Sequence, residues 1–346
     1  MSISDALIKL DNTIQKHGYS GSVLISFKGK VLFKKSYAFS NRELGTKNEI
    51  NSVYRIASIT KQFTAAGILK LVESGKISLN DPVSKVIVDY PSGNSILMHH
   101  LLSNSSGIQG FSLDTDFNDV LRSNNVNLEL IHLFQSLPLS FNPGSKFEYS
   151  ISGYLLLGYI IEIISKMSYI DFLKKYFFEP FEMNNTDFDD YQKIVPGRVQ
   201  GYDVSNGQIQ NARFIDMRIA GGGGALLSTV EDLHKWNIAL YSGAVINKEN
   251  IQKMTSSQVQ IIDSTDYGYG LFIEKENAEG IKRKKYYHTG GGPGVRSINS
   301  YYPEDEIEII MLSNANDNEV FSKTEESVEH IVFESLDILH GFNSKR

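Results

Sequence analysis

The sequence contains no cysteine among its 346 residues. Disulfide bonds, thiolate metal sites and a cysteine nucleophile are therefore all excluded. An excess of basic residues is also missing: 34 Lys and Arg stand against 40 Asp and Glu, and the net charge is −6. The one basic run, Lys282 to Lys285, is interpreted as a solvated hairpin. Because a protein that binds nucleic acid needs a basic face to neutralise phosphates, no nucleic-acid partner is expected.

The sequence has no apolar run long enough to cross a bilayer. Its most apolar stretch, Tyr154 to Ile164, is far shorter than the ~20 residues that a spanning helix needs, and it predicts a buried helix instead. The first residues, Met1 to His17, place apolar side chains at helical spacing among charged ones, unlike a signal peptide. The sequence on its own predicts a cytoplasmic protein, or a secreted or periplasmic one if a leader has been removed. The oligomeric state is left open.

Motifs of common nucleotide-binding and hydrolase folds are missing as well. No Gly-x-Gly-x-x-Gly follows the first predicted strand, and no Lys-Ser/Thr pair follows the glycines 221–224, which argues against dinucleotide and P-loop sites. No Gly-x-Ser-x-Gly elbow is present, which argues against an α/β-hydrolase. His99 and His100 are adjacent and are interpreted as surface or loop residues, not as a metal pair. No metal or organic cofactor is expected.

Strand patterns occupy both ends of the chain. Near the N-terminus, Gly21 to Phe27 and Val31 to Phe39 predict a hairpin that follows an opening helix. Near the C-terminus, alternation returns in four stretches before a last amphipathic helix from Glu319 to Leu339. These four are Tyr267 to Glu274, Lys284 to Thr289, Ser297 to Tyr302 and Glu306 to Leu312. Residues 76–261, between the two ends, predict helices and long loops.

This distribution predicts an α+β fold in which the two ends of the chain share one antiparallel sheet. The first and last helices would flank the sheet, and a mostly helical lobe would be inserted between its two halves. We therefore expect a discontinuous lobe of residues 1–75 and 262–346 and an inserted lobe of residues 76–261. The active site is expected in the cleft between the two lobes.

A serine and a lysine lie at the start of a helix predicted from Ser58 to Gly75. In the segment ASITKQF, Lys61 is three residues beyond Ser58, which places both side chains on one face of the helix. The helix N-terminus can stabilise developing negative charge, and an amine with a lowered pKa can accept the hydroxyl proton. Since a solvated serine and lysine at this spacing also arise by chance, further motifs are needed.

Two later segments supply further motifs. Tyr149, in FEYSISGY, lies where a loop enters the apolar helix, and it is either a proton relay or a capping or packing tyrosine. His288, in YHTGGGPG, ends a strand whose glycines allow a substrate backbone to lie against it. A structural histidine followed by an ordinary turn would explain the second segment equally well.

In order and spacing, the segments Ser58 to Lys61, Tyr149 to Ile151 and His288 to Gly290 resemble the three motifs of the serine β-lactamase and penicillin-binding protein superfamily. The likeness covers nearly the whole chain and is greatest to class C β-lactamases, D-alanyl-D-alanine carboxypeptidases and related esterases. The resemblance implies a β-lactamase/transpeptidase-like fold. It also implies four catalytic residues, Ser58, Lys61, Tyr149 and His288, and four substrate-binding residues, Thr289, Gly290, Gly291 and Ile151.

The resemblance implies a role for each catalytic residue. Ser58 would attack a carbonyl, while Lys61 and Tyr149 would take its proton and deliver one to the leaving group. His288 would hold the electrostatics of Tyr149 and of a substrate carboxylate. Backbone N–H groups of Ser58 and Gly291 would form the oxyanion hole. Water, activated by Tyr149, would then release the acyl group.

One position departs from the family pattern, because Ile151 stands where many relatives carry asparagine. In those relatives the asparagine hydrogen-bonds the lysine and the substrate amide carbonyl, and isoleucine can do neither. The resemblance implies a serine hydrolase whose substrate is a small molecule or short peptide, such as a D-amino-acid peptide amide or a β-lactam. A carboxylesterase of the same fold, a penicillin-binding receptor with little turnover and a biosynthetic acyltransferase stay open.

Overall fold

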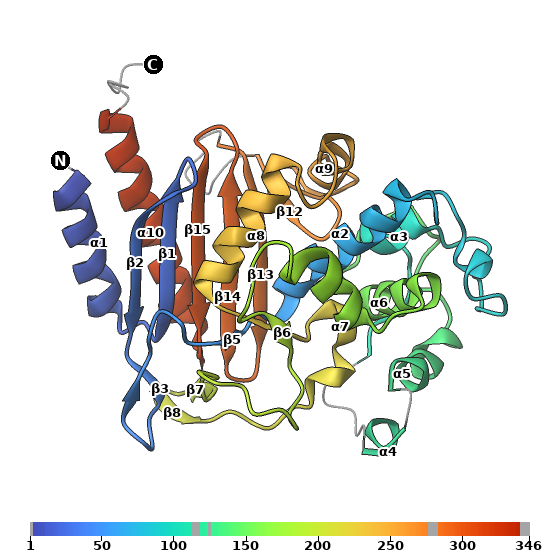
Figure 1. Ribbon diagram of the computed structural model, residues 1–346, viewed down its shortest axis with the longest axis horizontal. Coiled ribbons are helices and arrows are strands. Elements are labelled where there is room, and N and C mark those ends of the chain that lie inside the picture. Colours follow the sequence, from blue (N-terminus) through green and yellow to red (C-terminus); the bar gives the residue numbers. More distant parts are fainter. Residues whose placement is uncertain (1–2, 112–117, 124–125, 276–282, 340–346) are drawn as a thin grey trace.

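The structure is a computed structural model that describes residues 3–111, 118–123, 126–275 and 283–339. Its largest element is an eight-stranded antiparallel sheet (Figure 1). In spatial order the strands are β10 (Val259–Ile262), β11 (Thr265–Tyr267), β12 (Phe272–Glu274), β13 (Lys285–Gly292), β14 (Val295–Tyr302), β15 (Ile307–Ser313), β1 (Gly21–Phe27) and β2 (Lys30–Tyr37). The N-terminal hairpin joins the C-terminal strands through β1 and β15, which pair from Gly21 with Ser313 to Phe27 with Ile307. This pairing confirms the predicted fold class.

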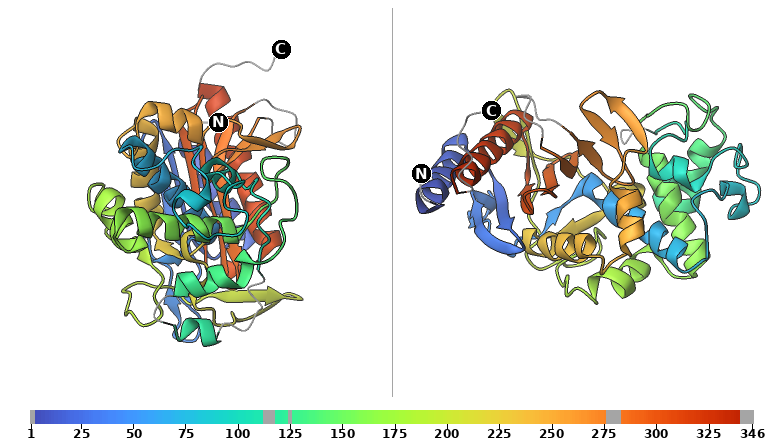
Figure 2. Two further views of the ribbon diagram at one scale, coloured as in Figure 1. Left: turned by 90° about the vertical axis from the view of Figure 1, so that its right-hand side faces the viewer. Right: turned by 90° about the horizontal axis from the view of Figure 1, so that it is seen from above.

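Two helices from opposite ends of the chain cover one face of the sheet. The helix α1 (Ile3–His17) and the helix α10 (Asn318–Leu339) lie side by side there (Figure 2). Leu10 and Ile14 of α1 are buried against strand residues such as Ile25, and Val328 belongs to the same apolar cluster. The predicted flanking helices are therefore present; Met1, where the first was expected to begin, lies outside the described residues.

The opposite face of the sheet is covered by helices from the middle of the chain. The helix α2 (Thr60–Glu73) lies on this face, where Gln62 Oε1 accepts from Asn299 Nδ2 of β14 at 3.0 Å, and α6 (Ile151–Ser165) packs against α2. The helix α8 (Val230–Ser242) lies on β1 and β15, and its Trp236 stacks on Phe63 of α2 with ring centroids 4.0 Å apart. The division of the chain into residues 1–75, 76–261 and 262–346 stays a prediction.

Short elements complete the middle of the chain. The helices are α3 (Met98–Leu102), α4 (Asn118–Leu121), α5 (Val126–Gln135), α7 (Tyr169–Leu173) and α9 (Lys248–Met254). The short strands are β3 (Phe39–Asn41), β4 (Thr46–Lys47), β5 (Tyr54–Arg55), β6 (Asp187–Phe188), β7 (Tyr202–Ser205), β8 (Gln208–Asn211), β9 (Leu226–Ser228) and β16 (Ala315–Asn316). Four of these eight strands, β6 to β9, lie in the region that the sequence predicted as helices and loops, because two to four residues are too few to show alternation.

The predicted strand from Tyr267 to Glu274 was wrong, because this segment forms the adjacent ends of β11 and β12 with a turn between them. Gly270, in the turn, has φ +73°, and a Cβ there would lie 2.5 Å from the carbonyl oxygen of Lys61. Only glycine allows so close an approach, so the turn brings the strand ends against α2. The predicted strand from Val31 to Phe39 is likewise interrupted, at Ala38.

The basic run was also misjudged at its last residue. Lys285 is buried beneath α10, where its Nζ lies 3.1 Å from Glu325 and 2.6 Å from Glu329. Lys282 lies outside the described residues. Lys285 is therefore not part of a solvated hairpin. Its side chain is buried because two glutamates of a helix distant in the sequence compensate its charge.

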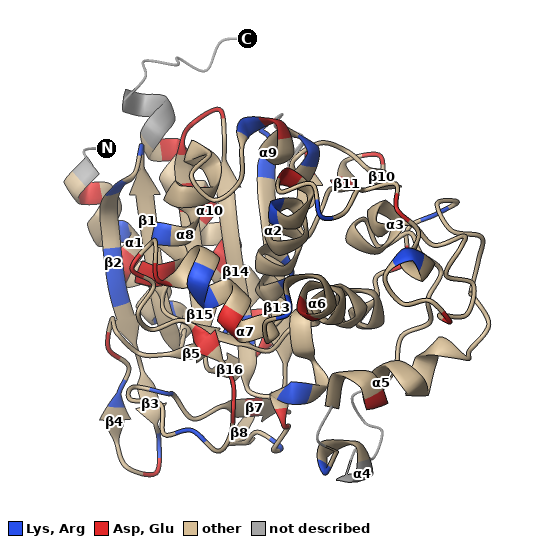
Figure 3. Ribbon diagram, turned by 45° about the vertical axis from the view of Figure 1, so that its right-hand side comes forward, with Lys and Arg blue, Asp and Glu red and all other residues tan. Residues whose placement is uncertain are grey.

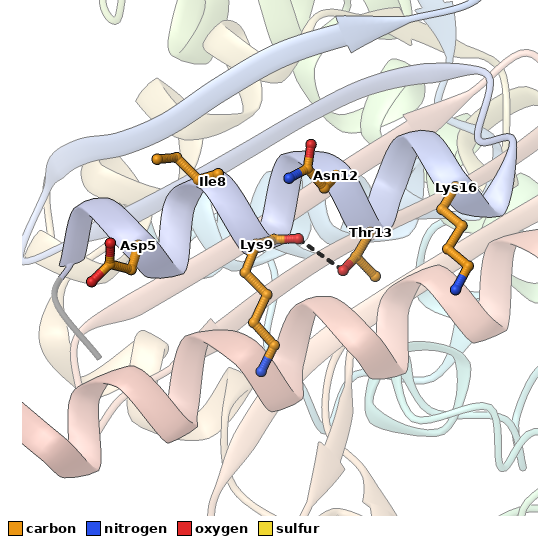
Figure 4. A pocket seen from close by; sticks show the side chains of 6 residues that line it. All are labelled: Asp5, Ile8, Lys9, Asn12, Thr13 and Lys16. Atoms are coloured by element: carbon orange, nitrogen blue, oxygen red, sulfur yellow. Dashed lines mark hydrogen bonds between the residues drawn. The ribbon is translucent and has the colours of Figure 1, made fainter.

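Charged residues of both signs are interspersed over the elements of the ribbon (Figure 3). Within the described ranges, no helix combines the length and the apolar character that crossing a membrane requires. An open groove runs along α1 beside α10, lined by side chains of α1 (Figure 4). Lys9 of this groove forms an ion pair with Glu334 of α10 at 3.0 Å. This groove lies on the face of the sheet opposite to α2, and its polar lining comes from a single helix.

Candidate active site

Ser58 lies in a short 3-10 turn, Ala57–Ile59, that leads into α2. The turn is anchored by β9, since the N–H of Ile56 donates to the carbonyl of Leu226 at 3.0 Å. Ala57 has φ +45°, a left-handed conformation that costs a residue with a Cβ about 1 kcal/mol. Ser58 is the middle residue of this strained turn and is partly exposed, so its hydroxyl is presented at the helix start.

Lys61 is buried and faces Ser58. Its Nζ lies 3.2 Å from Ser58 Oγ and donates to the carbonyl oxygen of Gly223 at 2.7 Å. Burial lowers the pKa of Lys61 to about 7. With a pKa of about 7, a substantial share of Lys61 is uncharged at neutral pH, and an uncharged amine beside a hydroxyl is a base that can activate a serine.

Tyr149 lies over the same lysine. Lys61 Nζ is 4.7 Å from the centre of the Tyr149 ring. Burial of the hydroxyl raises the pKa of Tyr149, while its hydrogen bond with Ser58 acts in the opposite direction. The residue as a whole is 42% exposed, and its ring stacks on Phe272 with centroids 6.4 Å apart. Tyr149 is therefore a neutral phenol at neutral pH, with its hydroxyl at Ser58.

His288 is buried on β13 and uncharged. Burial and the nearby charge of Lys61 lower the pKa of His288 to about 3. We assign the proton to Nδ1, which donates to the carbonyl of Thr289 at 2.6 Å, so that Nε2 accepts from the Tyr267 hydroxyl at 3.2 Å. A neutral imidazole offers no net charge to a substrate carboxylate. His288 can therefore act on the substrate only through the dipole and the hydrogen bonds of its ring.

The end of β13 has one open edge. The neighbouring strand β12 pairs only with residues 285–287 of β13, so the residues from His288 onward have no paired strand on that side among the described residues. Gly290 packs against the turn before the nucleophile, since a Cβ there would lie 2.4 Å from the carbonyl oxygen of Ile56. Thr289 and Gly291 are exposed at this edge. A free edge beside the nucleophile can pair with an extended substrate backbone.

Ile151 begins α6 and contacts the glycine loop of residues 221–224, to which the sequence motifs assigned no catalytic or binding role. A Cβ on Gly223 would lie 2.7 Å from Ile151 Cγ1. The carbonyl of Gly223 accepts from Lys61, and that of Gly222 accepts from Thr64 at 2.6 Å. A backbone carbonyl, and no side chain of residue 151, is therefore the partner of the lysine on this side. Four consecutive glycines were the only sequence signal for it.

Arg296 is a further residue that the motifs did not indicate. The turn at Pro293 and Gly294 places Arg296 of β14 opposite Gly291. Its Nη1 lies 2.2 Å from the position that a Cβ on Gly291 would take, so the guanidinium extends over β13. Burial lowers the pKa of Arg296, while Asp203 acts in the opposite direction. Its register in the hairpin could have been inferred from the short turn.

The adjacent histidines lie on α3 and are partly buried, not in a loop. Nδ1 of His99 is 2.6 Å from the Tyr269 hydroxyl, and that of His100 accepts from the N–H of Leu97 at 3.1 Å. Each ring thus has its own protein partner. In the part of the chain that the structure describes, no three His, Asp or Glu residues gather as metal ligands would.

This fold, with a serine and a buried lysine at a helix start beside a glycine-rich strand edge, is typical of the β-lactamase and penicillin-binding class of proteins. The family model described as Beta-lactamase matches residues 9–332. The chain belongs to the Beta-lactamase family.

Known proteins agree with this assignment. The chain is 28% identical over 341 residues to penicillin-binding protein 4* of Bacillus subtilis, covering 92% of this chain and 73% of that one. A penicillin-binding protein from Bacillus halodurans superposes with a TM-score of 0.83 at 27% identity, over 93% of this chain and 98% of the other. A D-amino acid amidase from Ochrobactrum anthropi has the same fold, with a TM-score of 0.83 at 21% identity over 98% and 100% of the two chains. These similarities support a serine hydrolase of this fold.

Proposed function

We propose that the protein hydrolyses an amide, either a D-amino-acid peptide or amide or a β-lactam, through an acyl-enzyme on Ser58. The observation that carries this proposal is the 3.2 Å contact between Ser58 Oγ and Lys61 Nζ, together with the lysine pKa of about 7. The similarity to penicillin-binding proteins supports the amide class, and the D-amino acid amidase shares the fold.

The chemistry follows from the protonation states. Ser58 Oγ bonds to the substrate carbonyl carbon as its proton passes to Lys61, directly or through Tyr149. Backbone N–H groups of Ser58 and Gly291 hold the oxyanion. When the carbon–nitrogen bond breaks, the neutral Tyr149 phenol is placed to give its proton to the leaving nitrogen and to recover one from Lys61. Water then attacks the ester, and the same groups return the proton to Ser58.

His288 and the free strand edge complete the site. The neutral ring of His288 fixes the Tyr267 hydroxyl and lies 6.0 Å, centroid to centroid, from the ring of Tyr149. Thr289 and Gly291 would pair with the substrate backbone along β13. Arg296 takes the charged role that His288 cannot fill, because its guanidinium lies beside Gly291 and is permanently protonated.

A carboxylesterase of the same fold is the second candidate, and Ile151 favours it. An ester substrate without an acylamino side chain needs no amide partner. An apolar residue at the start of α6 therefore leaves no polar group of such a substrate without a hydrogen bond. The partly exposed ring pair of Tyr149 and Phe272 offers apolar surface for such a substrate.

A substrate panel separates these candidates. D-phenylalanine amide, L-phenylalanine amide, p-nitrophenyl acetate and benzylpenicillin would be incubated with the wild type and with Ser58→Ala. The proposal predicts amide hydrolysis with a preference for the D enantiomer. Ester hydrolysis alone would support the esterase, and a persistent penicillin adduct without turnover would support a receptor. No reaction with any of the four would contradict the proposal.

Replacing Ile151 with asparagine is expected to raise the rate of acylation by benzylpenicillin about 10-fold. The new carboxamide would lie against Gly223, within reach of Lys61, and would supply the amide partner that isoleucine lacks. Stopped-flow or quenched acylation kinetics measure the change. Ile151→Val, which keeps the apolar contact, should leave the rate near that of the wild type. An Asn variant as slow as the Val variant would argue against this interpretation of position 151.

Replacing Arg296 with glutamine is expected to raise KM for a substrate that carries a carboxylate about 10-fold, the loss of one charge-assisted hydrogen bond. Benzylpenicillin and its methyl ester form a matched pair for the measurement, because only the first carries the anion. The KM for the methyl ester should stay unchanged. An equal rise for both compounds would show that Arg296 supports the strand rather than the carboxylate.

A further inference from the structure

Asn104 lies in the turn that follows α3, outside all three sequence motifs. It is 2% exposed, and its φ of +53° is in the left-handed region, which asparagine tolerates better than most residues with a side chain. Its own N–H donates to the carbonyl of Leu101 at 3.3 Å, which fixes the turn to the helix. A buried polar residue in this conformation calls for a physical reason.

The contacts of Asn104 supply the reason, because one residue binds both neighbours of Tyr149. The Asn104 carbonyl oxygen accepts from the N–H of Glu148 at 2.9 Å, and its side-chain Oδ1 accepts from the N–H of Ser150 at 3.2 Å. Ser150 in turn caps α6, since its Oγ accepts from the N–H of Gly153. The backbone on each side of Tyr149 is therefore held by Asn104, and the side after it is also held by the helix.

The placement of Tyr149 depends on this backbone. Tyr149 is 42% exposed, so packing restrains its side chain less than it restrains a core side chain. Its hydroxyl must nevertheless stay at Ser58 and its ring over Lys61. Fixing the two flanking peptides sets the position of the Tyr149 Cα, from which the long side chain extends to the nucleophile.

The other end of the carboxamide points to the second half of the site. Oδ1 of Asn104 is used by Ser150. Its Nδ2 is buried beside the hydroxyl of Tyr267, and among the described residues no other hydrogen-bond acceptor is available to it. That hydroxyl donates to Nε2 of His288. Asn104 thus lies between the loop that carries Tyr149 and the strand that carries His288.

We propose that Asn104 is a positioning residue that holds the Tyr149 hydroxyl at Ser58 by binding the backbone on both sides of Tyr149. This inference rests on the proposed function. Glycine would satisfy the left-handed backbone but would release Ser150, and a β-branched residue would satisfy neither requirement. Asparagine is suited to both at once.

The test compares Asn104→Gly with the wild type by the rate constant for acylation by benzylpenicillin, followed by intact mass. The variant keeps the backbone conformation and removes only the carboxamide, so the expected result is a fall of about 10- to 100-fold, the effect of a misplaced catalytic group. Asn206→Gly is the matched control, because Asn206 also has a positive φ, +51°, in the exposed turn between β7 and β8. It should react like the wild type.

Two readouts separate positioning from a general loss of structure. In a Tyr149→Phe background, Asn104→Gly should change the rate less than about 2-fold, since the hydroxyl it positions is gone. The pH midpoint of acylation, set by buried Lys61, should stay at the wild-type value while the plateau falls. Asn104→Asp, which keeps an oxygen for Ser150, should recover most of the rate.

Three results would overturn the inference: a rate for Asn104→Gly equal to that of the wild type, the same loss in both backgrounds, or a midpoint raised toward that of a solvated lysine. A wild-type protein that forms no adduct with penicillin, p-nitrophenyl acetate or D-phenylalanine amide would contradict the proposed function first and remove this inference with it. A normal wild-type adduct with an unaffected Asn104 variant would contradict the inference alone.

Discussion

Replacing Ser58 with alanine is expected to lower the turnover of the best substrate by about 10⁴-fold or more, because the oxygen that forms the acyl-enzyme is gone. The fold should not suffer, since the Ser58 side chain is partly exposed and its Oγ contacts Lys61 and Tyr149 at the surface of the site. Steady-state kinetics and thermal unfolding measure the two effects.

The control for this variant is Ser74→Ala. Ser74 lies at the other end of α2, where its Oγ donates to the carbonyl of Leu71 at 2.9 Å, so it matches Ser58 in residue type and helix but not in role. The turnover of the Ser74→Ala variant should stay within about 2-fold of that of the wild type, as for most surface substitutions. Substantial activity in Ser58→Ala would show that another group is the nucleophile.

Replacing Lys61 with methionine is expected to lower the acylation rate by about 10²- to 10⁴-fold, the usual contribution of a general base. The pH dependence identifies the cause. Only the neutral amine can take a proton, and the pKa of Lys61 is about 7, so the wild-type rate should rise with pH through that value and then level off. The residual rate of the variant should lack this rise. A variant with the same midpoint would mean that a different group titrates.

The same substitution should make the protein more stable. The pKa of Lys61 is lowered from 10.5 to about 7 on folding, so between these values the unfolded chain binds a proton that the folded chain does not. The folded state is therefore penalised progressively as the pH falls from 10.5, and the penalty is complete below 7. The unfolding temperature of Lys61→Met should exceed that of the wild type, and the difference should be larger at pH 7 than at pH 10.

The sequence predicted much of the large sheet because runs of strand-forming residues are a local property. The strands β1 and β15 are such runs of seven residues, buried almost throughout, and the flanking helices show apolar residues at helical spacing. The turn between β11 and β12 did not, because Gly268 and Gly270 are needed there for close contacts with other segments. Burial of Lys285 was equally hidden, since its partners Glu325 and Glu329 come from a helix that only the fold brings near.

In the candidate site too, local features could be predicted from the sequence and tertiary contacts could not. Ser58 and Lys61 are one helical turn apart, so their contact could be predicted from spacing alone, and the structure brings Tyr149 and His288 to the same place. The remaining partners act through tertiary contacts that leave no side-chain pattern. Gly223 contributes a carbonyl, and Asn104 contributes a carbonyl and a carboxamide in a turn.

The measurement that tests the account most directly is time-resolved intact mass of the wild type and Ser58→Ala with benzylpenicillin, followed by peptide mapping of any adduct. The account predicts a mass increase equal to one penicillin on the wild type only, located on the peptide that contains Ser58, and decaying as the acyl group is hydrolysed. An adduct of the same mass on Ser58→Ala, or one mapped to a different peptide, would contradict it.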